Sequence, residues 1–334
     1  MKAKELYSQK HIFWAVSLSL MGTALAVLLY FYFPSDKPFY FDSESLNARV
    51  SPEYIEEMRA FNKVSLTYSP FSACPSLPIW LILLIFCFTI SPVLILESTR
   101  AFRKLRHTFN YPIRRILWLL SILGAGMATL VFVPRLLSSQ MNIHLYPPIH
   151  DFSTKLGISV LITTVASVLG LLVILITGNI AYNHRKRLPN KETISRYYVL
   201  HQLQMRFLKI IGALISLASL TTYFMQQIHL DLYGKDQPFI NSQGVATEGI
   251  FYTFILALFF IPARTELQRF GNYIVDQELG KRPKEGESWQ NWAAERESML
   301  QTFGLKTSWK DLTGWAIPLL SPLISSVLPE QFFR

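Results

Sequence analysis

Six long apolar stretches recur along the chain, separated by polar segments. They lie at residues 12–33, 77–96, 116–134, 156–183, 210–228 and 246–262. The second and third contain no charged residue, and each is long enough to cross a bilayer core of about 30 Å as a helix. The pattern therefore predicts an all-α polytopic membrane protein with six transmembrane helices.

The polar segments between these stretches alternate in charge. The segment after residue 96 carries Arg100, Arg103, Lys104, Arg106, Arg114 and Arg115 against one acid, Glu97. The segment after residue 183 begins with Arg185, Lys186 and Arg187. Because short basic loops stay on the cytoplasmic side, we expect both loops and both chain termini to be cytoplasmic. The stretches at 77–96 and 116–134 then form a membrane hairpin, and residues 191–209 form a helix on the membrane surface.

The ends of the chain are interpreted from local signals. The stretch at 12–33 ends in aromatic residues followed by Pro34, which favours a retained helix over a cleaved signal peptide. Ser51 and Pro52 begin a predicted outer-loop helix at about 51–64. From Ala263 the composition becomes that of a small soluble region. We therefore divide the chain into a membrane domain, 1–262, and a cytoplasmic or interfacial helical region, 263–334.

The last apolar segment, 312–329, raises the alternative of a seventh crossing. It is interrupted by Gly314, Pro318 and Pro322. Because proline removes a backbone donor and breaks a helix, an interfacial or subunit-contact helix is preferred there.

Composition supports the membrane class and excludes others. The 334 residues are 51% hydrophobic and 16% charged, and the net charge is +10. The excess of positive charge lies in short loops, which favours contact with anionic lipid headgroups and gives no reason to expect nucleic acid. No Asn-x-Ser/Thr acceptor occurs, so a bacterial inner membrane is preferred. Cys74 and Cys87 are predicted to be free thiols.

Motifs of common enzymes are absent from the sequence. There is no Walker loop, no Gly-x-Gly-x-x-Gly, no His-Glu-x-x-His and no Cys-x-x-Cys. His144, His150 and Asp151 could in principle form an outer metal site, but an ordinary loop is the preferred interpretation. We therefore expect a protein that is not an enzyme and has no cofactor or metal.

Polar groups inside the apolar stretches are the candidate functional residues. Glu248 is the single ionisable candidate, at the edge of a short sixth stretch whose other end, Arg264, is expected to reach the cytoplasmic surface. Uncharged groups could line a narrow wet path or join neighbouring helices. The candidates for lining or gating a path are Glu248, Thr163, Thr164, Ser167, Ser216, Ser219, Thr222 and Gln226. Small-residue pairs at Gly22/Ala26, Gly124/Ala128, Ala166/Gly170 and Gly212/Ser216 predict close helix packing.

Two functions fit these features. The first is a homo-oligomeric channel or pore-type membrane effector, because the spans are polar but uncharged and no energy-coupling motif is present. The alternative is a membrane-embedded sensor or anchor whose basic loops and C-terminal helices bind a soluble cytoplasmic partner. The residues expected to contact lipid or that partner are Arg100, Arg103, Lys104, Arg106, Arg185, Lys186 and Arg187.

Overall fold

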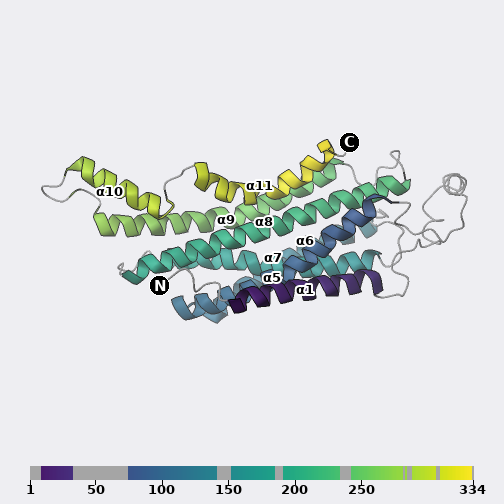
Figure 1. Ribbon diagram of the computed structural model, residues 1–334, viewed down its shortest axis with the longest axis horizontal. Coiled ribbons are helices and arrows are strands. Elements are labelled where there is room, and N and C mark those ends of the chain that lie inside the picture. Colours follow the sequence, from purple (N-terminus) through teal and green to yellow (C-terminus); the bar gives the residue numbers. More distant parts are fainter. Residues whose placement is uncertain are drawn as a thin grey trace, which may run out of the picture.

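The computed structural model describes eight α-helices and no strand in residues 9–32, 74–140, 152–184, 191–233, 242–280, 283, 288–305 and 309–332. The helices run side by side as an elongated bundle, with α10 extending beyond one end (Figure 1). They are α1 (Gln9–Tyr32), α5 (Ser76–Phe109), α6 (Ile113–Gln140), α7 (Phe152–His184), α8 (Lys191–Tyr233), α9 (Ser242–Leu279), α10 (Trp289–Thr302) and α11 (Trp309–Phe332). The predicted outer-loop helix at 51–64, the triplet at 185–187 and the loop with His144, His150 and Asp151 lie outside the described residues.

Four of these helices are long and apolar enough to cross a membrane, rather than the predicted six. They are α5, α7, α8 and α9. The predicted spans at 12–33 and 116–134 correspond to α1 and α6. In α1 the apolar length among the described side chains is only Ser19–Leu28, and in α6 only the side chains of 113–126 are described. The fold is therefore all-helical, with four candidate spans among the described residues. The side of the membrane on which each loop lies stays a prediction.

The predicted hairpin differs from the structure at its bend. Helix α5 continues through the basic segment to Phe109, and the chain reverses at Asn110, whose φ of 49° is left-handed. Helix α6 then packs against α7 and has few contacts with α5 among the described residues. The basic side chains up to Arg106 therefore extend from α5, and Arg114 and Arg115 belong to the first turn of α6, so these residues do not lie on a loose loop.

Helix α8 also differs from the prediction of a surface helix that turns into a span. It is continuous over 43 residues. No Gly or Pro lies between Lys191 and Lys209 to interrupt it. The buried Tyr197 and Leu200 pack this first part into the main core, so it continues the bundle. Core packing therefore replaces the expected contact with the membrane surface.

Close approaches at glycine determine how the helices pack. A Cβ atom on Gly178 of α7 would lie 2.7 Å from the Cα atom of Ala263 in α9. One on Gly170 of α7 would lie 2.8 Å from Cδ1 of Ile211 in α8. The predicted small-residue pairs are therefore helix contact sites at Gly22, Gly170 and Gly212, whereas Gly124 in α6 has nothing within 4 Å.

Helix α11 lies along the candidate spans. Gly212 of α8 meets the backbone of Pro318, and Gly249 of α9 meets Ser326. Among the described side chains of α11, Thr313 is exposed near its start, and the other exposed ones are apolar: Ile317, Leu320, Ile324 and Val327. These four side chains continue the exposed apolar surface of α9, which consists of Ile250, Phe251, Phe254, Leu258 and Ile261. Such a surface is compatible with a lipid environment, and α11 packs against α8 and α9, two of the candidate spans.

The two ends of the described chain are far apart in the bundle. Helix α1 begins at the end where α8 begins, whereas α11 ends near the beginning of α9 (Figure 1). The proposed domain boundary at residue 263 falls inside the continuous helix α9. The cytoplasmic position of both termini stays a prediction.

Candidate functional site

A cavity of about 210 Å³ lies among α7, α8 and α9, next to Trp80 of α5. Five predicted path-lining residues from these three helices line it: Thr163, Thr164, Ser167, Thr222 and Glu248. Residues that are far apart in sequence thus share one cavity. We call it the outer cavity, since the predicted topology places it on the outer side.

Helical spacing explains why these side chains face the same space. Thr163 and Ser167 are four residues apart on α7, and so lie one turn apart on one face. Glu248 and Tyr252 have the same spacing on α9, and Ala218 and Thr222 repeat it on α8. Each helix therefore presents one stripe to the cavity and an apolar face to its surroundings.

Among the described residues that line the cavity, Glu248 alone is a charged type. It is partly buried. The Oγ1 atom of Thr222 donates to its Oε1 atom at 3.2 Å, and the Tyr252 hydroxyl donates to the same carboxylate. Among the described residues it forms no ion pair. A carboxylate held by two hydroxyls in a mostly apolar cavity is a typical functional arrangement in membrane proteins.

The other three path candidates do not line the outer cavity. Ser216 donates to the carbonyl of Gly212 at 2.7 Å, and Ser219 donates to that of Ile215 at 3.2 Å. Both hydroxyls thus bond their own helix, as serines in membrane helices commonly do. Gln226 is buried outside the lining.

An apolar layer closes the cavity toward the basic end of the bundle. Leu171 and Leu214 belong to its lining, and next to them Gly170 packs against Ile211 and Leu94. Leu94, Leu171, Leu214 and Ile211 are all at most 1% exposed. We call these five residues the apolar layer.

A second group of polar side chains lies beyond the apolar layer. Gln204 precedes Ile211 by seven residues on α8, and Thr177 follows Gly170 by seven on α7. Seven residues are about two helical turns, or about 10 Å, and return to the same face. Because Gly170 packs against Ile211, this spacing places Thr177 and Gln204 at a similar level beyond the apolar layer. Ser98 of α5 lies one turn beyond Leu94, and we call these three residues the inner layer.

The inner layer is fully buried and incompletely hydrogen-bonded. Ser98, Thr177 and Gln204 are all 0% exposed. Both polar atoms of the Gln204 side chain and the Ser98 hydroxyl have no hydrogen-bond partner in the part of the chain that the structure describes. Such groups usually bind an ordered water molecule. Gln204 was not among the predicted residues, because the composition of residues 191–209 indicated a helix on the membrane surface. The signal that could have identified it is its seven-residue distance from Ile211, which places both residues on one face of a helix.

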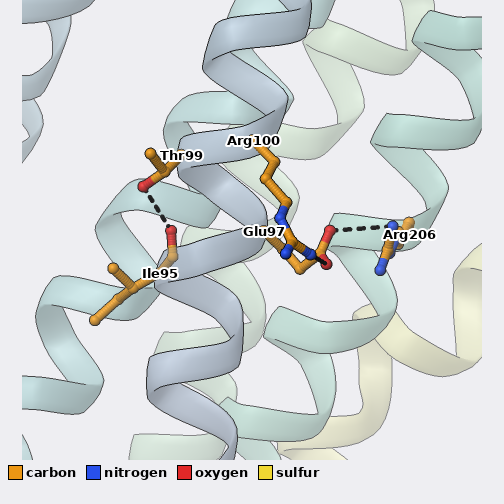
Figure 2. Close-up of polar contacts among 5 residues, drawn as sticks. All are labelled: Ile95, Glu97, Thr99, Arg100 and Arg206. Atoms are coloured by element: carbon orange, nitrogen blue, oxygen red, sulfur yellow. Dashed lines mark hydrogen bonds and ion pairs between the residues drawn. The ribbon is translucent and has the colours of Figure 1, made fainter. Parts of the chain in front are cut away.

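An ion-pair cluster lies beside the inner layer. Glu97, whose side chain is 12% exposed, accepts from Arg100 of its own helix and from Arg206 of α8, both at 3.1 Å (Figure 2). Two of the residues expected to contact lipid or a partner, Arg103 and Arg106, are exposed beyond this cluster. Lys104 is partly buried. Arg100, in contrast, is engaged with Glu97, so the acid joins α5 to α8.

Helix α10 docks onto the bundle through its carboxyl end. The hydroxyls of Tyr198 and Tyr197 donate to the carbonyls of Thr302 and Phe303, at 3.1 and 2.9 Å. Arg264 donates to the carbonyl of Gly304 at 3.4 Å. Arg264 is 7% exposed, so it does not extend to the surface as expected. It instead binds the segment that follows α10.

Metal and cysteine chemistry find little support in the structure. No group of three or more His, Cys, Asp and Glu side chains that could hold a metal occurs within the described ranges. Cys74 and Cys87 are both buried and free, which confirms the prediction. Burial and the nearby Asp231 carboxylate raise the pKa of the Cys74 thiol to about 12, so the reactive thiolate is scarce at neutral pH.

Comparison of the chain with protein-family models, with curated proteins and with solved structures found no match.

Proposed function

We propose that this chain is a channel-type membrane protein whose path runs inside its own helix bundle. The observation that carries the proposal is the outer cavity, where Glu248 and five Ser or Thr side chains from three helices converge. Polar side chains do not stabilise a helix face that is exposed to lipid, because hydrocarbon does not solvate polar groups. A water-filled cavity accounts for their convergence.

The order of the layers supports a path that is closed in this conformation. The outer cavity leads to the apolar layer, and the inner layer of Ser98, Thr177 and Gln204 follows on the same helices. Short apolar constrictions between polar sections close channels because water leaves them. The packing of Gly170 against Ile211 and Leu94 is such a constriction.

This path lies inside a single chain. It lies among α5, α7, α8 and α9 of one chain. A homo-oligomer is still expected, as are contacts with anionic headgroups through Arg103 and Arg106. Each chain would then contain its own path.

A second candidate function is the membrane sensor or anchor. Helix α10 has no buried residue, and its Trp289 is 64% exposed. An exposed tryptophan on a helix that extends past the bundle is a suitable contact for a soluble protein. Removal of residues 283–305 would abolish partner capture in this case, whereas the channel proposal does not depend on such a partner.

Cysteine accessibility tests the channel proposal. In intact cells or oriented vesicles, a cysteine in place of Thr222 should react with a charged, membrane-impermeant thiol reagent, because it lines the wet cavity. A cysteine in place of Ile211 should not react, because the apolar layer is dry. The wild-type chain serves as background, since its two thiols are buried.

Ile250→Cys is the matched control for exposure to lipid. Ile250 lies on α9 close to Glu248 but is 57% exposed on the apolar surface. Its cysteine should stay unreactive toward a charged reagent. An unreactive cysteine at 222, or equal reaction at 222 and 250, would show that the cavity is not wet and would remove the basis of the channel proposal.

A further inference from the structure

The outer cavity holds one carboxyl group and no basic side chain among its described lining residues. Glu248 is its single ionisable lining group apart from the phenol of Tyr252, and no Lys, Arg or His lines it. Within the described part of the chain, its printed partners are the hydroxyls of Thr222 and Tyr252. An ionised carboxylate in such surroundings is costly unless a cation accompanies it. The cavity is therefore suited to a cation supplied from outside the chain.

The hydroxyl groups of the cavity are arranged to accept hydrogen bonds. Thr163 donates its hydrogen to the carbonyl of Ser159 at 2.8 Å, and Thr221 donates to that of Ala218 at 2.6 Å. Because each hydroxyl has one hydrogen and two lone pairs, these oxygens remain acceptors toward the cavity. A ligand with N–H donors matches this pattern better than a ligand with acceptors.

Aromatic and aliphatic side chains form the rest of the wall. Trp80, Phe251 and Tyr252 line the cavity together with Leu214 and Met225. Aromatic faces attract organic cations, and aliphatic walls bind their hydrocarbon part. Phe251 is also 41% exposed, so the cavity reaches the surface of the bundle beside it. The volume of about 210 Å³ fits several water molecules or one small organic ion.

We propose that the outer cavity is a binding site for a small organic ammonium ion, a protonated alkylamine. Its nitrogen binds the Glu248 carboxylate and its hydrocarbon part packs against Trp80 and Phe251. A metal cation fits less well, because Ca²⁺ and Mg²⁺ take six or more oxygen ligands and this wall offers one carboxylate among scattered hydroxyls. The inference deepens the proposed function and rests on its wet cavity.

Binding is tested on the purified full chain in detergent, with butylammonium chloride as the probe. Thermal stability and tryptophan fluorescence are followed while the probe is titrated at constant ionic strength. We expect saturable binding that is roughly ten-fold or more tighter than that of butan-1-ol, which has the same hydrocarbon part but no charge. Tetramethylammonium, which lacks N–H donors, should bind more weakly than butylammonium.

Two variants locate the site. Glu248→Gln should weaken butylammonium binding roughly ten-fold or more and leave butan-1-ol binding unchanged. Thr222→Val should weaken butylammonium binding several-fold. This second variant still tests the site if Glu248→Gln does not fold. Ser216→Ala is the control, because Ser216 lies on α8 outside the cavity. Equal binding of the amine and the alcohol, or unchanged binding after both cavity substitutions, would overturn the proposal.

The channel proposal and the ligand proposal can be contradicted independently of each other. If Thr222→Cys reacts with the charged reagent but butylammonium does not bind, the cavity is wet and the ligand class is wrong. If butylammonium binds but Thr222→Cys is unreactive, the site exists and the channel proposal is wrong.

Discussion

Replacement of Ile211 by serine is expected to raise the flux of potassium and of glycerol through reconstituted vesicles by roughly ten-fold or more. Ile211 is 0% exposed, and its side chain fills the space beside Gly170. Serine at this position lacks three side-chain carbon atoms of isoleucine and adds a hydroxyl group. Water should then connect the outer cavity with the inner layer, and the path should conduct.

Two companion variants make this result interpretable. Ile211→Ala removes the same bulk without a hydroxyl, so it should raise flux less than the serine variant. Both lose stability, since a buried isoleucine truncated to alanine costs about 2–5 kcal/mol. Ile261→Ser places the same change on the exposed apolar face of α9, where Ile261 is 50% exposed, and should leave flux at the wild-type level.

A leak that is the same for Ile211→Ser and Ile261→Ser would mean that hydroxyls merely loosen the bundle. Unchanged flux in Ile211→Ser, in protein that still elutes as a folded species, would mean that no path passes this position. Either result contradicts the closed constriction at the apolar layer.

Gly178→Leu is expected to give a large loss of stability. A Cβ atom at this position would lie 2.7 Å from the Cα atom and 2.8 Å from the Cβ atom of Ala263. Since the obstacle is the backbone of α9, the two helices would have to separate. Overpacking of a core commonly costs about 1–3 kcal/mol, and a clash with backbone should lie at or above the top of that range. The measurement is thermal unfolding in detergent, with size-exclusion chromatography of the same sample.

The matched control is Gly157→Leu on the same helix. Nothing lies within 4 Å of a Cβ atom at Gly157, and leucine favours the helix more than glycine does. Its melting temperature should therefore equal or slightly exceed that of the wild type. Equal losses in the two variants would show that α7 and α9 do not pack at Gly178, and the wall of the cavity would have to be reassigned.

Apolar periodicity was enough to predict an all-helical membrane protein, because a span is a local property of length and hydropathy. It did not determine how the helices pair. The basic residues near Arg103 suggested a loop, yet they continue helix α5 because no Gly or Pro interrupts that segment before Asn110. Helix α6 then packs on α7, which depends on tertiary contacts that no window of sequence contains.

Part of the candidate site was visible in the sequence. Glu248 and Thr222 are polar groups in apolar stretches, and the structure places both in the outer cavity. Gln204 was missed, because its neighbours Arg206 and Lys209 gave the segment the composition of a membrane-surface helix. Ser216 was included but bonds its own backbone. Polarity alone does not distinguish a hydroxyl that bonds its own helix from one that faces a cavity.

The most direct test of this account is an experimental density map of the full chain in a lipid nanodisc. The account predicts lipid against α5, α7, α8 and α9, ordered water or solute beside Glu248, and no such density between Gly170 and Ile211. Acyl-chain density filling the cavity beside Glu248, or a bundle in which α8 and α9 lie outside the lipid, would contradict it.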